Sequence, residues 1–159
     1  MKSPHLLRVT DPPERFASLI AAARALNLRI GWLDWPGECP VPSALEAAAE
    51  LGVLRAVAVG EGRTVSVKPL RGRPILKDLL REHFLGCALV LVRGDVDAPG
   101  LEPDQDAWRL QLPGSSERTS RRLTTAELAE SLRKPHPWAS KATPGGPSGP
   151  TGRENGAQG

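Results

Sequence analysis

The run from Cys87 to Val92 reads Cys-Ala-Leu-Val-Leu-Val and is the most apolar stretch of the chain. A strand with one side in water alternates apolar and polar residues, whereas a strand covered on both sides is apolar throughout. This run therefore predicts a central strand in a sheet whose two faces are both covered. That constraint favours a layered fold in which helices pack on a sheet.

The segments around this run alternate between strand-like and helix-like patterns. Helices are expected where apolar side chains recur at helical spacing, over 13–26, 44–51, 74–85 and 125–133. Strands are expected between turn signals, over 6–9, 28–32, 54–59, 64–67, 87–92 and 107–112, and the tight turn after 59 makes an antiparallel hairpin. We therefore predict an α/β fold, a single-domain sandwich with a mixed, mostly parallel sheet of about five or six strands and helices on its faces.

Local signals mark where several of these helices begin and end. Ser43–Glu46 and Thr124–Glu127 both match the capping box, in which a hydroxyl and a carboxylate satisfy free backbone N–H groups. Pro74 suits the first turn of the third helix. Gly52 and Gly86 stand where the second and third helices are expected to end.

The last 25 residues, 135–159, contain five Pro and six Gly. Their few apolar side chains bury too little surface to offset the entropy lost on ordering. We predict an α/β domain over 1–134 and a disordered Pro/Gly-rich tail over 135–159. The whole chain of 159 residues is 40% apolar and 25% charged, which suits one soluble domain.

Cys39 and Cys87 are the two cysteines of the chain, and they do not form a CxxC pair. The apolar run at the N-terminus is two residues long before Arg8, so the sequence predicts no signal peptide and a cytoplasmic location with reduced thiols. No stretch approaches the roughly 20 apolar residues of a membrane helix, so no membrane partner is expected. No cofactor or metal is predicted, because no phosphate loop, dinucleotide fingerprint or zinc spacing occurs.

Positive charge concentrates between Arg63 and Arg81, although the net charge of the chain is only +3. A helix start offers free backbone N–H groups to anions, and an Arg side chain bonds two phosphate oxygens at once. The favoured hypothesis is a non-catalytic binding module whose segment 68–81 binds a phosphate-bearing ligand or an acidic protein surface. A solvated basic face is the alternative. The expected anion-binding residues are Lys68, Arg71, Arg73, Lys77 and Arg81.

A second polar group follows the expected strands on the other rim of the sheet. Ligand loops of α/β sheets lie at the carboxyl ends of strands, and the hairpin divides these ends between two rims. Clustered carboxylates or a reactive thiol at this rim point to a small enzyme, which is the alternative function. The rim residues are Asp11, Asp34, Trp35, Glu38, Cys39 and Glu61, while Arg93 and Asp95 are expected on the rim of the basic segment.

Weak nucleic-acid binding is a third alternative. Arg71–Pro74 reads Arg-Gly-Arg-Pro and resembles the core of an AT-hook, which implies contact with the DNA minor groove. The near-neutral charge of the chain argues against this reading. Asp95–Asp106 is acidic and matches a Ca²⁺ loop at only some of its ligand positions. A solvated acidic loop is therefore expected there. The sequence leaves the oligomeric state open.

Overall fold

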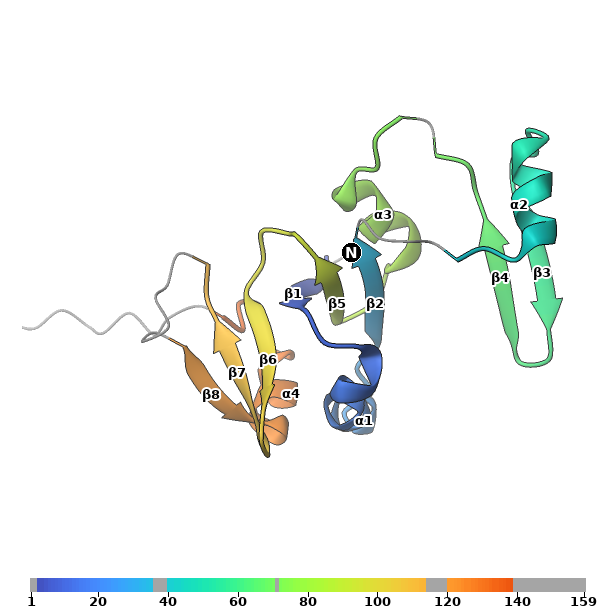
Figure 1. Cartoon of the computed structure of the whole chain (residues 1–159). Coiled ribbons are helices and arrows are strands. Elements are labelled where there is room, and N and C mark those ends of the chain that lie inside the picture. The colour runs from blue at the N-terminus through green and yellow to red at the C-terminus, as the bar shows by residue number, and fades with distance from the viewer. Residues whose placement is uncertain (1–2, 36–39, 71, 114–119, 139–159) are drawn as a thin grey trace, which may run out of the picture.

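The computed structural model describes residues 3–35, 40–70, 72–113 and 120–138, and it contains a six-stranded sheet and a separate two-stranded sheet (Figure 1). The strands are β1 (His5–Val9), β2 (Ile30–Trp35), β3 (Ala56–Gly60), β4 (Arg63–Val67), β5 (Leu89–Gly94), β6 (Gly100–Asp104), β7 (Ala107–Gln111) and β8 (Arg121–Thr124). The helices are η1 (Pro13–Phe16), α1 (Ala17–Ala25), α2 (Ser43–Glu50), α3 (Leu76–His83) and α4 (Thr125–Ser131). The large sheet has the order β2-β5-β1-β6-β7-β8, in which β1, β2, β5 and β6 run parallel and β7 runs against its neighbours.

The apolar run at Cys87–Val92 forms the interior strand β5, as predicted. β5 lies between β2 and β1 and runs parallel to both. Leu89 and Leu91 point to one side of the sheet and Val90 and Val92 to the other, and all four are 0% exposed. Successive side chains of a strand alternate between faces, so both faces of this strand are covered.

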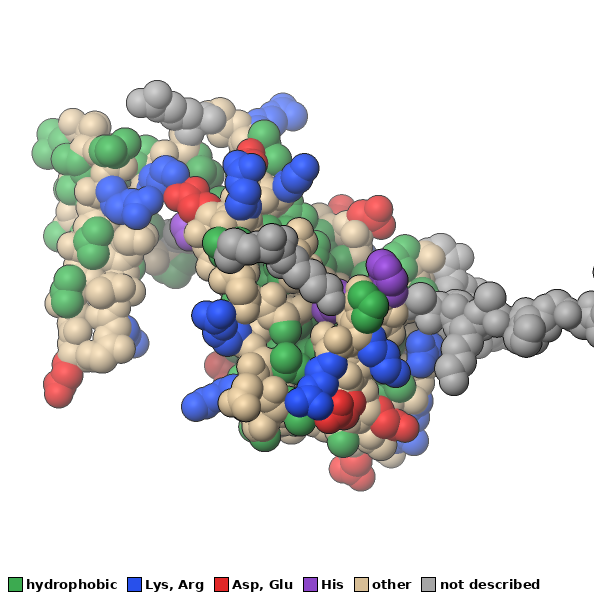
Figure 2. All heavy atoms as spheres, turned by 180° about the vertical axis from the view of Figure 1, so that it is seen from behind, with side chains coloured by type: hydrophobic (Ala, Val, Ile, Leu, Met, Phe, Trp, Pro, Cys, Tyr) green, Lys and Arg blue, Asp and Glu red, His purple; other side chains and the backbone are tan. Residues whose placement is uncertain are grey.

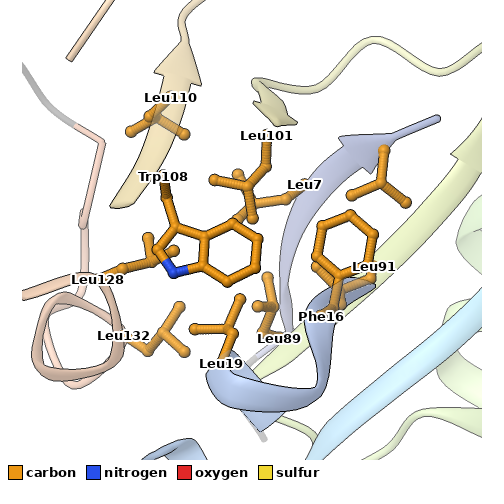
Figure 3. Close-up of a cluster of buried hydrophobic side chains, with 11 residues drawn as sticks. Leu7, Phe16, Leu19, Leu89, Leu91, Leu101, Trp108, Leu110, Leu128 and Leu132 are labelled. Carbon is orange, nitrogen blue, oxygen red and sulfur yellow. The ribbon is translucent and has the colours of Figure 1, made fainter. Parts of the chain in front are cut away.

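The larger core lies on the face that carries α1 and α4 (Figure 3). Phe16 stacks on Trp108 with ring centroids 5.5 Å apart and an interplanar angle of 17°. The indole N–H of Trp108 donates to Thr125 Oγ1 at 2.9 Å, so the one polar group of this ring is satisfied inside the core. Leucines from β1, β5, β6, β7, α1 and α4 surround this pair: Leu7, Leu89, Leu91, Leu101, Leu110, Leu19 and Leu128.

Among the described helices, α3 is the one that packs on the opposite face. Leu76 and Leu80 of this helix pack against the cluster of Val90 and Val92 of β5, as does Phe84, which directly follows the helix in the chain. The side chains of β6 and β7 that belong to the core point to the other face, so α3 covers only part of this side of the sheet. The α/β fold with helices on both faces is confirmed.

The membership of the sheet differs from the sequence expectation. The hairpin β3–β4 forms a sheet of its own, because α2 covers one of its faces and buries Leu45 and Ala56 there. β6 and β8 join the large sheet instead. The sequence expected β6 as part of an acidic loop and placed no strand at β8, because each holds a single large apolar side chain, Leu101 or Leu123, among mostly polar neighbours. The expected edge strand over 107–112 is the interior strand β7.

The observed ends of α2, α3 and β2 differ from those expected from the sequence. The capping box of α4 is confirmed, but Ser43 lies inside α2, whose N-cap is Pro42 without a side-chain hydrogen bond. α3 begins two residues later than expected because Ile75, with φ −111° and ψ 115°, is still extended. The expected loop after 32 remains strand to Trp35, because pairing with β5 continues that far.

The described chain ends at Trp138. Pro137 is buried, and Trp138 packs against the larger core and lies edge-on to His5 with centroids 6.2 Å apart. Packing therefore continues past the expected domain end at 134. Residues 135–138 of the predicted disordered tail are described, whereas 139–159 lie outside the described residues. Among the described residues, none of the helices has the length and apolarity needed to cross a bilayer.

We expect Leu91→Ala to lower the free energy of unfolding by about 2–5 kcal/mol, because it removes buried surface and leaves a cavity. Val59→Ala is the control, since Val59 is 79% exposed, and it should change stability by less than about 0.5 kcal/mol. Urea denaturation followed by circular dichroism measures both. Equal costs for the two variants would contradict the central position of β5.

We expect Thr124→Ala to destabilise the protein by about 1 kcal/mol, while Ser43→Ala has little effect. Thr124 Oγ1 accepts from the Glu127 N–H at 3.2 Å, and the Thr124 N–H donates back to Glu127 Oε2 at 2.8 Å. These bonds to Thr124 also hold the pKa of the Glu127 carboxyl below its usual value. The same denaturation assay tests the pair, and a comparable loss for both serine and threonine variants would contradict the difference in capping.

Candidate ligand-binding site

The described residues of the basic segment do not gather around one point. Lys68 follows β4, Arg73 is exposed in the loop before α3, and Lys77 and Arg81 lie on α3 itself. Arg71 lies outside the described residues. α3 starts at Leu76, so the expected cradle of Arg side chains around a helix start at Pro74 is not formed by the described residues.

Lys68 is engaged in a contact within the fold. Its Nζ donates to both carboxylate oxygens of Glu82, at 2.8 and 3.0 Å, and Arg55 reaches the same carboxylate at 3.4 Å. Glu82 belongs to α3, whereas Lys68 and Arg55 flank the hairpin β3–β4, so these ion pairs join the hairpin to the main body. The hydrogen bond from Lys68 lowers the pKa of the Glu82 carboxyl below its usual 4.5.

Among the predicted anion-binding residues that the structure describes, Lys77 and Arg81 lie together. They lie one helical turn apart on α3 and both line a groove of about 740 Å³. Arg81 also pairs with Asp78 at 3.2 Å, but this exposed contact is screened by water and holds the guanidinium only weakly. Lys77 forms no hydrogen bond or ion pair with any residue in the described part of the chain.

The rest of this groove, which we call the α3 groove, is mainly apolar. It lies between α3 and the N-terminal segment that leads into β1, and its volume is in the range of small-molecule pockets. The two cations of the groove were predicted from the sequence, but its apolar half was not, because Leu6 is distant from α3 in the chain. The other lining residues are Ser3, Pro4, Leu6, Leu76, Leu80 and Leu85.

The predicted separation of two rims is wrong, because β1, β2 and β5 all run in one direction. Asp34 and Arg93 end neighbouring strands at the same edge, where Arg93 Nε donates to Asp34 Oδ1 at 2.6 Å. The Trp32 indole N–H donates to the other oxygen of Asp34 at 3.3 Å, and the Arg93 guanidinium lies 5.9 Å from the Trp32 ring centre. The Asp34 carboxylate therefore has a cationic and a neutral hydrogen-bond donor at this edge.

Among the described members of the expected enzyme rim, none forms a hydrogen bond or ion pair with the Asp34 side chain. Asp11 is half-buried at the start of the segment after β1, and Trp35 packs into the smaller core. Glu61 lies at the tip of the β3–β4 hairpin, in the other sheet. Glu38 and Cys39 lie outside the described residues. Within the described ranges, no three His, Cys, Asp or Glu side chains are close enough to hold a metal ion.

The expected acidic loop over 95–106 is also more ordered than predicted. Its second half forms β6, and Asp104 accepts ion pairs from Arg109 of β7 at 3.4 Å and from Arg122 of β8 at 3.2 Å. Glu102 lies 4.0 Å from Arg109. The basic partners come from adjacent strands that the sequence did not place beside this segment.

Apolar side chains are also exposed around the hairpin, as Figure 2 shows on the lobe at the left of that view. α2 covers the Ala56 face of β3, whereas Val57 and Val59 lie on the other face and are 52% and 79% exposed. Exposed apolar surface of this extent is typical of interaction surfaces. The larger exposed apolar residues of this lobe are Leu51, Val53, Leu54, Val57, Val59, Val65 and Leu70.

No family model matches this chain, and no curated protein matches it. Among solved structures, the crystal structure of Bacillus subtilis MobB is similar, with a TM-score of 0.41 and 15% sequence identity. The aligned region covers 60% of this chain and 65% of the MobB chain. A likeness at this level carries no functional argument.

We expect the contact between the hairpin and α3 to be lost in acid. The folded pKa of Glu82 lies below 4.5, so its ion pair with Lys68 is intact above that pH and is lost as the pH falls through the folded pKa. NMR shifts of the Lys68 and Glu82 amides should move together in this range. Glu82→Gln should abolish the change, whereas Glu50→Gln, on the exposed part of α2, should leave it intact. A Glu82 carboxyl that titrates at or above pH 4.5 would contradict the contact.

Proposed function

We propose that this chain is a non-catalytic binding module for an amphiphilic anion, a small molecule with an apolar body and a phosphate or carboxylate group. The proposed site is the α3 groove. The observation that carries the proposal is that Lys77 and Arg81 flank a cavity of about 740 Å³ whose other lining is chiefly leucine. The site keeps the anion-binding role expected for segment 68–81 and adds an apolar requirement.

The two halves of the groove suit different parts of such a ligand. An apolar chain placed on Leu6, Leu80 and Leu85 gains about 25 cal/mol for each Å² of surface that it removes from water. The ammonium of Lys77 and the planar guanidinium of Arg81 suit phosphate or carboxylate oxygens at the mouth. A purely polar anion leaves the leucines in water, so the groove favours amphiphiles over free phosphate.

The lining also supports binding rather than catalysis. Ser3 is the one hydroxyl among the described residues around the groove, and neither histidine nor carboxylate belongs to that set. A serine nucleophile needs an adjacent general base, and the described lining offers none. Of the carboxylates of the expected enzyme rim, Asp34 lies at the opposite edge of the sheet from this groove, where it is paired with Arg93.

We expect decyl phosphate and decanoate, used below their micelle concentrations, to bind more tightly than uncharged decanol or inorganic phosphate. The double variant Lys77→Gln and Arg81→Gln should raise the Kd for decyl phosphate at least tenfold, or about 1.4 kcal/mol. Isothermal titration calorimetry measures the constants. Affinity should also fall as salt rises, because the exposed cations are screened.

The matched control is Arg15→Gln with Arg24→Gln, which removes the same charge near α1 on the opposite face of the sheet. Leu85→Ser tests the apolar half, since Leu85 is 50% exposed and its loss spares the core. A control pair as costly as the Lys77 and Arg81 pair would reduce the attraction to diffuse charge. Wild-type protein that binds neither amphiphile, or binds a short DNA duplex more tightly, would overturn the proposal.

A further inference from the structure

A second cavity, of about 380 Å³, lies at the carboxyl ends of β1 and β5 beside the start of β6. The α3 groove lies at the other end of β1, around Leu6, so the two are separate. We call this second cavity the carboxyl-edge cavity. Its lining includes Arg8, Thr10, Arg93, Asp95, Gly100, Glu102 and Gln111.

The connections that leave this edge diverge. The chain after β1 runs through α1, on one face of the sheet, to β2. The chain after β5 passes β1 to reach β6, and its Val96 and Ala98 pack on the other face. In α/β sheets, adjacent strands whose connections part in this way leave a crevice at their carboxyl ends, and ligands bind there. The position of the cavity follows from the strand order.

Strand register places three residues side by side across this part of the sheet. Arg8 of β1 pairs with Gly100 of β6, and Gly100 pairs with Gln111 of β7. An ideal Cβ on Gly100 would lie 3.8 Å from Arg8 Nη2 and 3.6 Å from Gln111 Oε1. The missing side chain therefore leaves a gap between a guanidinium and an amide. A larger residue at 100 would close it.

The charges around this gap are mixed. Arg8 interrupts the apolar strand β1, and its guanidinium makes no ion pair within the described ranges. Arg93 forms an ion pair with Asp34, so among the described residues of the lining Arg8 is the cation without an ion-pair partner. Asp95 and Glu102 are exposed and offer carboxylate oxygens, and Thr10 and Gln111 offer a hydroxyl and an amide.

We propose that the carboxyl-edge cavity binds a small phosphorylated polyol. Arg8 holds the phosphate through its planar fork, with help from the Thr10 hydroxyl and the Gln111 amide. Asp95 and Glu102 accept hydrogen bonds from the hydroxyl groups of the ligand, which a bare phosphate lacks. Two carboxylates beside one free Arg disfavour a ligand that consists of negative charge alone.

Ribose 5-phosphate is the probe, with ribose and inorganic phosphate as its two separated halves. We expect ribose 5-phosphate to bind more tightly than either half in calorimetry. On addition of ribose 5-phosphate, the NMR shifts of the protein backbone amides should change mainly at Thr10, Gly100 and Gln111, while those of α3 stay unchanged. That pattern distinguishes this site from the α3 groove, so each proposal fails or stands independently.

Two variants test the geometry. Arg8→Gln should raise the Kd for ribose 5-phosphate at least tenfold, whereas Arg121→Gln, on the exposed part of β8, should leave it unchanged. Gly100→Ala should weaken binding while keeping the melting temperature, because the added methyl meets its neighbours at ordinary contact distances of 3.6–3.8 Å. Gly60→Ala in the hairpin is its control, since the nearest atom there is 3.8 Å away.

Each outcome decides the proposal. No measurable binding of ribose 5-phosphate to the wild-type protein would overturn it. So would affinity that is unaffected by both Arg8→Gln and Gly100→Ala. Inorganic phosphate that binds as tightly as ribose 5-phosphate would remove the polyol from the proposal and leave an unspecific anion site. Shifts confined to α3 would move the ligand to the other groove.

Discussion

Burial of β5 on both faces is the constraint on which the rest of the structure depends. Leu89 and Leu91 need the layer of α1 and α4, and Val90 and Val92 need α3. A strand without a solvent face has to be interior, and parallel neighbours reached by helical crossovers cover it from both sides. The two layers, and the grooves at their margins, follow from this one requirement.

Both candidate sites arise where this cover is incomplete. α3 packs over β5 but leaves Leu6 of β1 at the floor of the α3 groove. On the same face, β6 and β7 carry Gly100 and Gln111 instead of core side chains, and these line the carboxyl-edge cavity with Arg8. In the described part of the chain, the short helix α3 covers this face incompletely and leaves an apolar groove at one end of β1 and a polar cavity at the other.

The β3–β4 hairpin lies outside these two layers and is stabilised separately. α2 gives β3 and β4 a small core of their own, and Glu82 attaches them to α3 through Lys68 and Arg55. An isolated two-stranded hairpin is marginal in water, so this lobe depends on α2 and on its ion pairs with the main body. Lys68 thus has a structural contact in a segment where the sequence suggested ligand binding.

The sequence by itself determined the elements with strong local patterns. The apolar run of β5, the helical spacing of α1 and the capping box of α4 specify their structure without distant partners, because each is a property of adjacent residues. Lys77 and Arg81 were likewise identifiable as a pair of exposed cations on one helix. Only the tertiary structure decided which strands share a sheet. β6 and β8 carry too few apolar side chains to be predicted as strands from the sequence. The pairings of Asp34 with Arg93 and of Arg8 with Gly100 join residues far apart in the chain.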